Sequence, residues 1–593
     1  MKATRHPSDK SEPTQAMSPE DGSLNFSASA PPLKRREFFQ RMGGITAGAT
    51  VLGLSSLAVE RSTAAPDAKP PKNADTGISP GNGNQRRDRA FRVRVQAADD
   101  EKKLHSSLHP NNGDEDLYPN KIGSYSKGLP HNNLGEVDLA AYQSLSRALA
   151  SGAPQDFEAI PLGSPVSARL KLVNPQSGLA FDLEGCDSQA QAIPPVPAFS
   201  SAEEAGEIVE NYWMALLRDV PFSDYAANPA AQLAASDISA LSDFRGPKQS
   251  GQVTAQTLFR GNAPGNNVGP YLSQFFYLPA PFGANFIEQR VRTTVSGVDY
   301  MTDYSDWLSI QRGIAPSVGN QFDPTRRYMR NGRDLSQWVH MDVLYQAYFH
   351  AMLILLTPPS GASDGNGLGA PFDNGNPYVH SQNQDGFGTF GGPHIAALMT
   401  EVATRALKAV WFQKWFVHRR LRPEAFAGRI QNHVSGAANY PIHSDALDSA
   451  AVAAVQIKNG NALLPMAFPE GCPPHPAYGA GHATVAGACV TILKAWFDES
   501  FVIPNPVQPT PDGLSLVPYF GAPLTVGGEL NKLAANVAVG RNIAGVHWRS
   551  DATASLKLGE EIAISILRDN RGCYNEDFSG FTLTKFDGTT VTV

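Results

Sequence analysis

Two histidines, seven residues apart, mark the stretch of this chain best suited to chemistry. They are His475 and His482, and the loop between them is rich in proline and glycine, which keep it out of regular structure. From His482 onward apolar residues recur with helical spacing, so we predict a buried helix that begins at Gly481. The unpaired N–H groups and positive dipole of such a helix start favour an oxyanion. Histidines in a glycine turn are more often structural, so this interpretation depends on residues elsewhere.

Two cationic side chains precede this loop. Lys414 and Arg422 are eight residues apart, a little over two helical turns, which places them near one face of a predicted helix. Pro423 is expected to end that helix and to leave Arg422 at its terminus.

A third motif follows the loop. Arg541 is followed by His547 and Asp551, and on a helix the last two lie one turn apart. The carboxylate could then fix the tautomer of the histidine. The three motifs together predict a cationic pocket with three histidines, suited to a tetrahedral oxyanion.

The motifs Lys-x7-Arg-Pro, Gly-His and Arg-x5-His-x3-Asp, in this order, resemble the signature of vanadium-dependent haloperoxidases. Acid and phosphatidic-acid phosphatases share the signature with slightly different spacing. Further stretches are similar to the red-algal and cyanobacterial bromoperoxidase branch: 127–131, 298–304, 387–394 and 401–408. The likeness extends from about Arg92 to the C-terminus.

The resemblance implies a role for each site residue. Vanadate would be bound by Lys414, Arg422, Gly481, Arg541 and His547. His547 would be the axial ligand of vanadium, held by Asp551, while His482 would act as general acid–base and His475 would tune that step. The implied reaction oxidises bromide, with chloride and iodide as further candidates, by hydrogen peroxide to a hypohalous acid that halogenates small organic nucleophiles.

Two positions depart from the family pattern. Ala480 stands where the loop usually has serine before Gly-His, so a hydroxyl donor worth about 0.5–1.5 kcal/mol is missing. Another donor or a water could fill this gap. Trp411 stands where red-algal relatives commonly have arginine, one helical turn before Lys414. Trp411 is either a core residue or a wall of the halide pocket that offers an N–H donor.

Two other functions compete with the haloperoxidase. A phosphatase would use His547 as nucleophile and His482 as acid, but the Lys414–Arg422 spacing, the chain length and His475 favour the peroxidase. Loss of activity, leaving an exported scaffold, is suggested by Ala480. The otherwise complete set of charged residues and histidines argues against it.

The predicted fold is all-α with long loops, because no strand pattern is long enough for a large sheet, and the resemblance implies two helical bundles. The chain has 593 residues, with 53 glycines and 46 prolines. Helical patterns occur near 138–151, 201–218 and 334–356, and Phe91–Val95 is predicted to be extended. We expect an N-terminal helical region at 91–330 and, at 331–593, the bundle that the resemblance assigns the active site.

The N-terminal segment has the features of an export signal. Arg35 and Arg36 precede a modest apolar run at 43–59 and small residues at 62–65. We read residues 1–65 as a twin-arginine signal that leads to a periplasmic or secreted protein, and 66–90 as a linker. A chance arginine pair before a membrane anchor is the alternative.

The net charge of −7 argues against a general nucleic-acid partner, and no membrane association is expected after signal removal. The resemblance implies a large homo-oligomer, a dodecamer. Four cysteines could form disulfides outside the cytoplasm, with no pairing evident: Cys186, Cys472, Cys489 and Cys573. Cys472 is also a weak candidate for a nucleophilic thiol.

The loop at 357–392 is rich in glycine, asparagine and aspartate. Candidate oxygen ligands for calcium are Asp373, Asn374, Asn376, Gln382, Gln384 and Asp385. The acidic calcium ligands of red-algal relatives align with neutral residues here, around His380 and Gln382. A solvated loop near a subunit contact is therefore the stronger interpretation.

Overall fold

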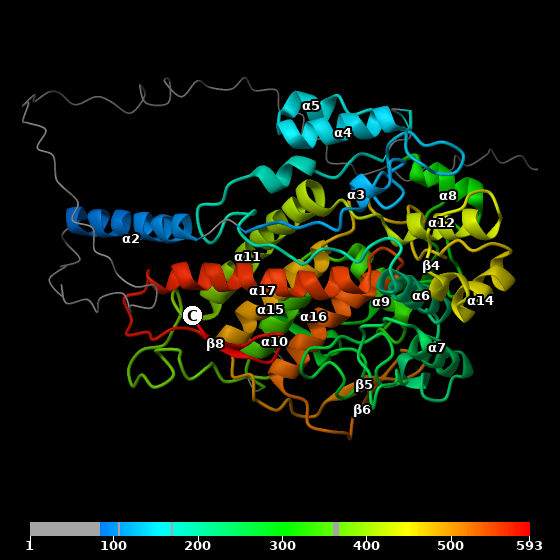
Figure 1. Ribbon diagram of the computed structural model, residues 1–593. Coiled ribbons are helices and arrows are strands. Elements are labelled where there is room, and N and C mark those ends of the chain that lie inside the picture. Colours follow the sequence, from blue (N-terminus) through cyan, green and yellow to red (C-terminus); the bar gives the residue numbers. More distant parts are fainter. Residues whose placement is uncertain (1–82, 105–106, 166, 168–169, 360–366) are drawn as a thin grey trace, which may run out of the picture. The chain divides into compact units, whose positions relative to one another are not determined.

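A computed structural model describes residues 83–104, 107–165, 167, 170–359 and 367–593. It is mostly helical, which confirms the all-α prediction (Figure 1). The helices are α2 Gly83–Lys103, α3 Asp114–Leu117, α4 Leu139–Ser151, α5 Pro154–Glu158, α6 Ala202–Leu216, α7 Pro229–Ala240, α8 Tyr304–Gln311, α9 Gly332–Met341, α10 Gln346–Leu356, α11 Gly392–Phe412, α12 Pro423–Val434, α13 Ser444–Leu447, α14 Ala450–Asn459, α15 Gly481–Trp496, α16 Val526–Ile543 and α17 Arg549–Arg571. The predicted signal region at 1–65 lies outside the described residues.

Short strands form four two-stranded antiparallel sheets in the described part of the chain. They pair as β1 Ala280–Phe282 with β2 Asn285–Ile287, β3 Val291–Thr294 with β4 Phe322–Arg327, β5 Val507–Pro509 with β6 Leu516–Pro518, and β7 Thr582–Thr584 with β8 Thr590–Thr592. Each of these sheets has only two strands, so helix packing forms the core.

The core is centred on α15, which packs against α11, α16 and α17. All of its residues except His482 are buried. Gly487 of α15 and Gly559 of α17 bring the two backbones together, because a Cβ atom at either position would collide with a backbone carbonyl of the other helix. This close approach sets the separation of the two helices, both of which begin near the predicted site.

The extended conformation predicted for Phe91–Val95 is wrong. These residues lie within α2, which also includes residues 83–90 of the predicted linker. Arginine, glutamine, alanine and glutamate around the short Val-Arg-Val alternation are good helix formers, and their propensities prevail over a pattern of only five residues.

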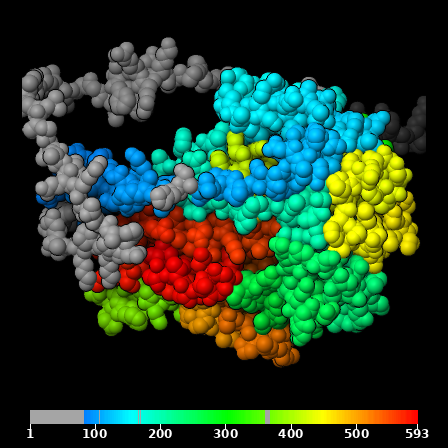
Figure 2. Space-filling view, in the orientation of Figure 1, coloured from blue at the N-terminus to red at the C-terminus, as the bar shows by residue number. Residues whose placement is uncertain are grey.

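In the space-filling view the blue segment that follows α2 crosses this face of the molecule (Figure 2).

The N-terminal helices largely follow their sequence patterns, since α4 and α6 match the segments predicted near 138–151 and 201–218. The pattern at 334–356 is divided between two helices, α9 and α10, which meet at 97°. Asp342 is the first residue of the break, with an extended backbone. No single described helix is long and apolar enough to cross a membrane. Among the described helices, only α9 and α10 taken together have the length and apolar composition of a membrane span, and they are bent. The predicted boundary at 330/331 stays a prediction.

Pro423 begins a helix instead of ending one. After α11 the chain forms a π-helix at Gln413–His418, turns at Arg419 with a φ of 38°, and enters α12 with Pro423 in its first turn. Proline suits this position because its missing N–H would have no helical partner there. Arg422 is the residue that precedes α12, so Lys414 and Arg422 do not share a continuous helix.

Candidate active site

Three buried cations define the candidate site: Lys414, Arg422 and Arg541. Lys414 Nζ donates to the carbonyl oxygens of Pro476 and Ala477, at 2.8 and 2.9 Å. None of the three forms an ion pair with a carboxylate of the residues that the structure describes. Buried charge of this kind is unfavourable unless an anion compensates it.

Arg422 connects the histidine loop to the third motif. Its Nε donates to the carbonyl of His475, and one terminal nitrogen lies 2.9 Å from His475 Nδ1. The other terminal nitrogen donates to Val546 O at 2.6 Å and lies 3.1 Å from His547 Nε2. Lys414 and Arg422 therefore converge on the same loop, although the π-helix and turn between them were not predicted.

His547 is held by Asp551, as the spacing predicted, but not on one helix. The helix α17 begins at Arg549, so His547 lies in the preceding turn, and Asp551 Oδ2 accepts the backbone N–H of Trp548 at 3.1 Å. His547 Nδ1 lies 2.8 Å from the same oxygen. A proton on Nδ1 leaves the Nε2 lone pair facing Arg422.

Arg541 completes the cluster. One terminal nitrogen donates to Val339 O at 2.8 Å, whereas its Nε is buried and has no partner among the described residues. Burial lowers the pKa of Arg541 to about 10. Such an unsatisfied guanidinium N–H is a donor available to a bound anion.

The cations and histidines shift one another in the same direction. Burial, followed by Arg422, lowers the pKa of Lys414 well below its usual value. Burial, then Lys414 and Arg422, does the same to the pKa of His475. Burial, then Arg422, also lowers the pKa of His547. A bound anion would reverse the unfavourable Coulomb contribution at each group.

The partner of His482 was missed by sequence reasoning. His482 Nε2 lies 3.0 Å from Asp342 Oδ1, whose side chain is 3% exposed. Asp342 reaches His482 because the helical pattern predicted through 334–356 breaks there. No sequence signal identified this break, since the apolar pattern continues across it.

Ala480 precedes α15 and provides no side-chain cap. Its backbone N–H donates to Ser555 Oγ at 2.8 Å, and Ser555 is fully buried on α17. The helix begins at Gly481, as predicted, and Gly481 packs against Trp411, because a Cβ atom there would lie 3.1 Å from the indole ring. A hydroxyl is therefore present beside the loop, contributed by another helix.

The part of the hypothesis in which the indole N–H of Trp411 is a donor to a halide is wrong. Trp411 Nε1 donates to Val173 O at 3.1 Å, so the indole N–H already has an acceptor. The ring centroid lies 4.8 Å from that of His475 and 5.6 Å from Lys414 Nζ. Trp411 is thus both buried and in contact with the site, which combines the two interpretations that the sequence left open.

All four cysteines are free thiols in the structure, so no disulfide is formed. Cys472 is buried, and burial followed by the nearby Glu424 raises the pKa of its thiol well above the ordinary value. Its sulfur lies 3.7 Å from Gly545 O. This environment disfavours the thiolate that nucleophilic catalysis requires.

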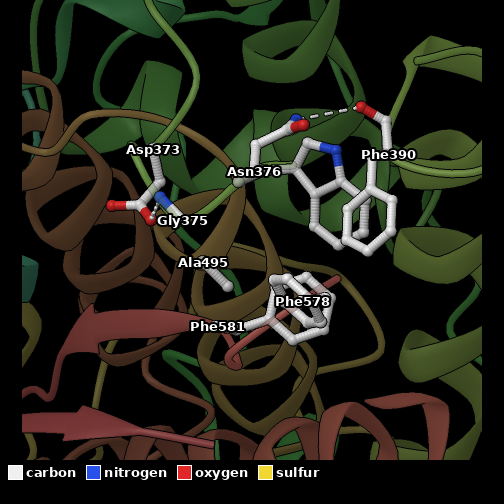
Figure 3. Close-up of a pocket in the computed structure, with 8 residues that line it drawn as sticks. Asp373, Gly375, Asn376, Phe390, Ala495, Phe578 and Phe581 are labelled. Atoms are coloured by element: carbon white, nitrogen blue, oxygen red, sulfur yellow. Dashed lines mark hydrogen bonds between the residues drawn. The ribbon is translucent and has the colours of Figure 1, made fainter. Parts of the chain in front are cut away.

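The predicted calcium loop borders a small cavity (Figure 3). Asp373, Gly375 and Asn376 lie on one side, and the remaining lining is mainly aromatic. The Asn376 amide donates to Phe390 O and accepts from Tyr378 N, and Asp373 Oδ1 accepts from Gly375 N. One side-chain oxygen of Asp373 and that of Asn376 are therefore engaged within the loop, and calcium binding stays a prediction.

Comparison with known proteins places this geometry in context. The family described as VCPO second helical-bundle domain matches residues 394–576. The vanadium-dependent bromoperoxidase of Corallina pilulifera is 39% identical over 610 aligned residues, which cover 87% of this chain and 100% of that protein. The vanadium-dependent bromoperoxidase of Ascophyllum nodosum is 35% identical over 538 residues, covering 87% and 94%. The solved homohexameric second vanadate-dependent bromoperoxidase of A. nodosum superposes with a TM-score of 0.78 at 31% identity, covering 90% of this chain and 94% of that one.

Proposed function

The chain belongs to the vanadium-dependent bromoperoxidases, and we propose that its cluster of unpaired cations holds the vanadate. The protein is a peroxide-dependent oxidoreductase that oxidises bromide with hydrogen peroxide to hypobromous acid, which halogenates organic substrates. The observation that carries the site assignment is the set of three buried cations that form no ion pair with a carboxylate in the described part of the chain.

The donor set fits a tetrahedral oxyanion. Lys414, Arg422 and Arg541 supply positive charge and N–H donors, including the unsatisfied Nε of Arg541. Neutral His547 offers the Nε2 lone pair as a ligand for vanadium, because Asp551 holds its Nδ1 side. Gly481 contributes the start of α15. When bound, vanadate supplies a Lewis acid that activates hydrogen peroxide toward attack by a halide.

We assign proton handling to His482 and its positioning to Asp342. The carboxylate fixes the Nε2 side of the imidazole at 3.0 Å, and the side chain of His482 is 19% exposed, so it can exchange protons with solvent. His475 is held by Arg422 and the ring of Trp411 and tunes the cationic side of the pocket. Trp411 forms a dry wall, and chloride and iodide are secondary substrates.

The two alternatives make different predictions in one assay. Purified protein loaded with orthovanadate is expected to brominate a phenol with hydrogen peroxide, and the protein without vanadate to show little hydrolysis of a phosphate ester. Dialysis against phosphate should remove the bromination, and excess vanadate should restore it. A phosphatase would hydrolyse the ester without vanadate, and an inactive scaffold would do neither.

Export and assembly are further parts of the proposal. The twin arginines at positions 35 and 36 support export by the twin-arginine route to the periplasm or medium. The solved A. nodosum relative is a homohexamer, which favours six subunits over the twelve first expected. Light scattering of the mature protein distinguishes the two assemblies.

A further inference from the structure

Met341 differs from the other methionines of the described chain in its exposure. It is 66% exposed, whereas the other six are at most 4% exposed: Met214, Met301, Met329, Met352, Met399 and Met466. A thioether is readily oxidised where solvent reaches it. Met341 is therefore the methionine in this part of the protein that an oxidant in solution can reach without local unfolding.

Met341 also lies close to the candidate site, without belonging to the proposed binding or catalytic residues. It is the last residue of α9, and its neighbour Asp342 contacts His482 Nε2 at 3.0 Å. Consecutive Cα atoms are about 3.8 Å apart, so the Met341 Cα lies within about 10 Å of that nitrogen. On its other side, His340 Nε2 contacts Glu470 Oε1 at 2.6 Å. Met341 therefore lies within a short distance of an oxidant that is released beside His482.

We propose that Met341 is the first residue that the enzyme oxidises with its own product, an inference that rests on the proposed function. The thioether sulfur attacks the bromine of hypobromous acid and releases hydroxide. Water then adds to the sulfur, bromide departs and two protons are released. Sulfur loses two electrons and bromine gains two, so the products are methionine sulfoxide, bromide and one net proton, and no further oxidant is needed.

Cys573 provides an internal comparison. It is an exposed free thiol that follows the C-terminal end of α17. The twenty residues from Asp551 to Arg571 span about 30 Å of helix, so the thiol is far from the site. Figure 1 shows α17 as one continuous helix. A thiol reacts with free hypobromous acid at least as readily as a thioether, so proximity alone would place Met341 first.

The test uses full-length, vanadate-loaded enzyme with bromide and limiting hydrogen peroxide, with and without free methionine in the buffer as a scavenger. Bromination of a phenol is followed in a parallel portion, and peptide mass mapping locates each added oxygen. Met341 is expected to gain one oxygen before Cys573 changes, and the scavenger should protect Cys573 more than Met341. When hypobromite is added to the solution instead, Met341 should no longer be oxidised before Cys573. Peroxide without bromide should leave Met341 unmodified over the same period.

Two variants serve as controls. Ile457 on α14 is 88% exposed, so Ile457→Met places a second exposed thioether on another element. Its oxidation should be suppressed by the scavenger while that of Met341 persists. Met341→Leu should brominate at the wild-type initial rate and lose the early oxidation product. Oxidation of Cys573 first, or equal protection of both methionines, overturns the inference while bromination persists; absence of bromination overturns the proposed function and this inference with it.

Discussion

Arg420 and Arg422 are two residues apart and both are buried, yet their surroundings are opposite. The guanidinium of Arg420 contacts the carboxylates of Glu204, Glu207 and Asp551. Among the residues that the structure describes, Arg422 has only carbonyl and imidazole partners. Removing a buried cation that is enclosed by carboxylates would leave buried charges unpaired, whereas a buried cation without a carboxylate favours an external anion.

Asp551 links the two environments. Its Oδ1 lies 2.8 Å from Arg420, and its Oδ2 lies 2.8 Å from His547 Nδ1. Arg420 thus holds Asp551 in place, and Asp551 in turn orients His547, the candidate metal ligand. Both arginines carry the same charge, so the comparison indicates that the presence or absence of carboxylate partners distinguishes a structural arginine from a candidate anion-binding arginine in this protein.

The largest expected effect is at His547. His547→Ala removes the candidate vanadium ligand and should lower vanadate-dependent bromination by more than about a hundredfold, since even loss of a supporting residue at a metal site has effects of 10–100-fold. Cys472→Ala is the control, because this buried thiol has no role in the proposed reaction. Normal bromination by the histidine variant, or a folded but inactive cysteine variant, would contradict the assignment.

The difference between Arg420 and Arg422 can be tested by replacing each with methionine and measuring the free energy of unfolding. Arg420→Met leaves buried carboxylates without their partner and should lower the free energy of unfolding by about 3–5 kcal/mol. Arg422→Met should lower it by less than half as much in anion-free protein.

Phosphate is the second readout of this pair. At a hundred times its dissociation constant it should stabilise the wild type by about 2.7 kcal/mol and the Arg422 variant hardly at all. Denaturant unfolding with and without phosphate measures both effects. Equal destabilisation with retained phosphate binding would remove the distinction.

Anion binding should take up protons. Burial and neighbouring cations lower the pKa of Lys414 and His475, so these groups lose protons more readily in the absence of a bound anion. A bound anion favours their charged forms, and the affinity for sulfate, which does not titrate between pH 5 and 9, should rise as pH falls. Calorimetry in buffers of different ionisation enthalpy measures the uptake, and an affinity independent of pH would oppose this description.

A smaller effect is expected at Ala480. Ala480→Ser restores the missing hydroxyl and should tighten vanadate binding by no more than about tenfold, the equivalent of one hydrogen bond. Vanadate titration of both proteins measures the change. Unchanged or weaker affinity would indicate that Ser555, or a water, already supplies the contact.

Trp411 is expected to have the smallest effect. Trp411→Arg replaces a dry wall beside His475 with a charge and should change the ratio of the specificity constants for bromide and chloride by several-fold, with vanadate binding nearly intact. The ratios are compared at saturating vanadate. If they are equal, Trp411 acts only as a packing residue.

Local sequence signals predicted several features correctly, including the start of α15 at Gly481 and the pairing of His547 with Asp551. These features depend on residues close together in the chain. Asp342 and Ser555 were missed because their contacts with His482 and Ala480 join segments 140 and 75 residues apart. Such contacts follow from tertiary packing, which no periodicity records.

The predictions around α11 and α12 show the same limit. The sequence predicts that Pro423 ends a helix and gives no sign of the π-helix before it, yet Lys414 and Arg422 both contact the loop at 475–477 in the structure. A motif can therefore indicate which residues meet while giving the wrong backbone path between them.

The contact between Gly487 and Gly559 limits how the enzyme can be redesigned. Gly487 is five residues from His482 in α15, and Gly559 is eight residues from Asp551 in α17. Any side chain at either position would push α15 and α17 apart, and with them the segment that carries His482 and the one that carries Asp551. In directed evolution of new halide or substrate preferences, we therefore expect substitutions beside the candidate site to be tolerated. Substitutions at Gly487 and Gly559 should abolish activity.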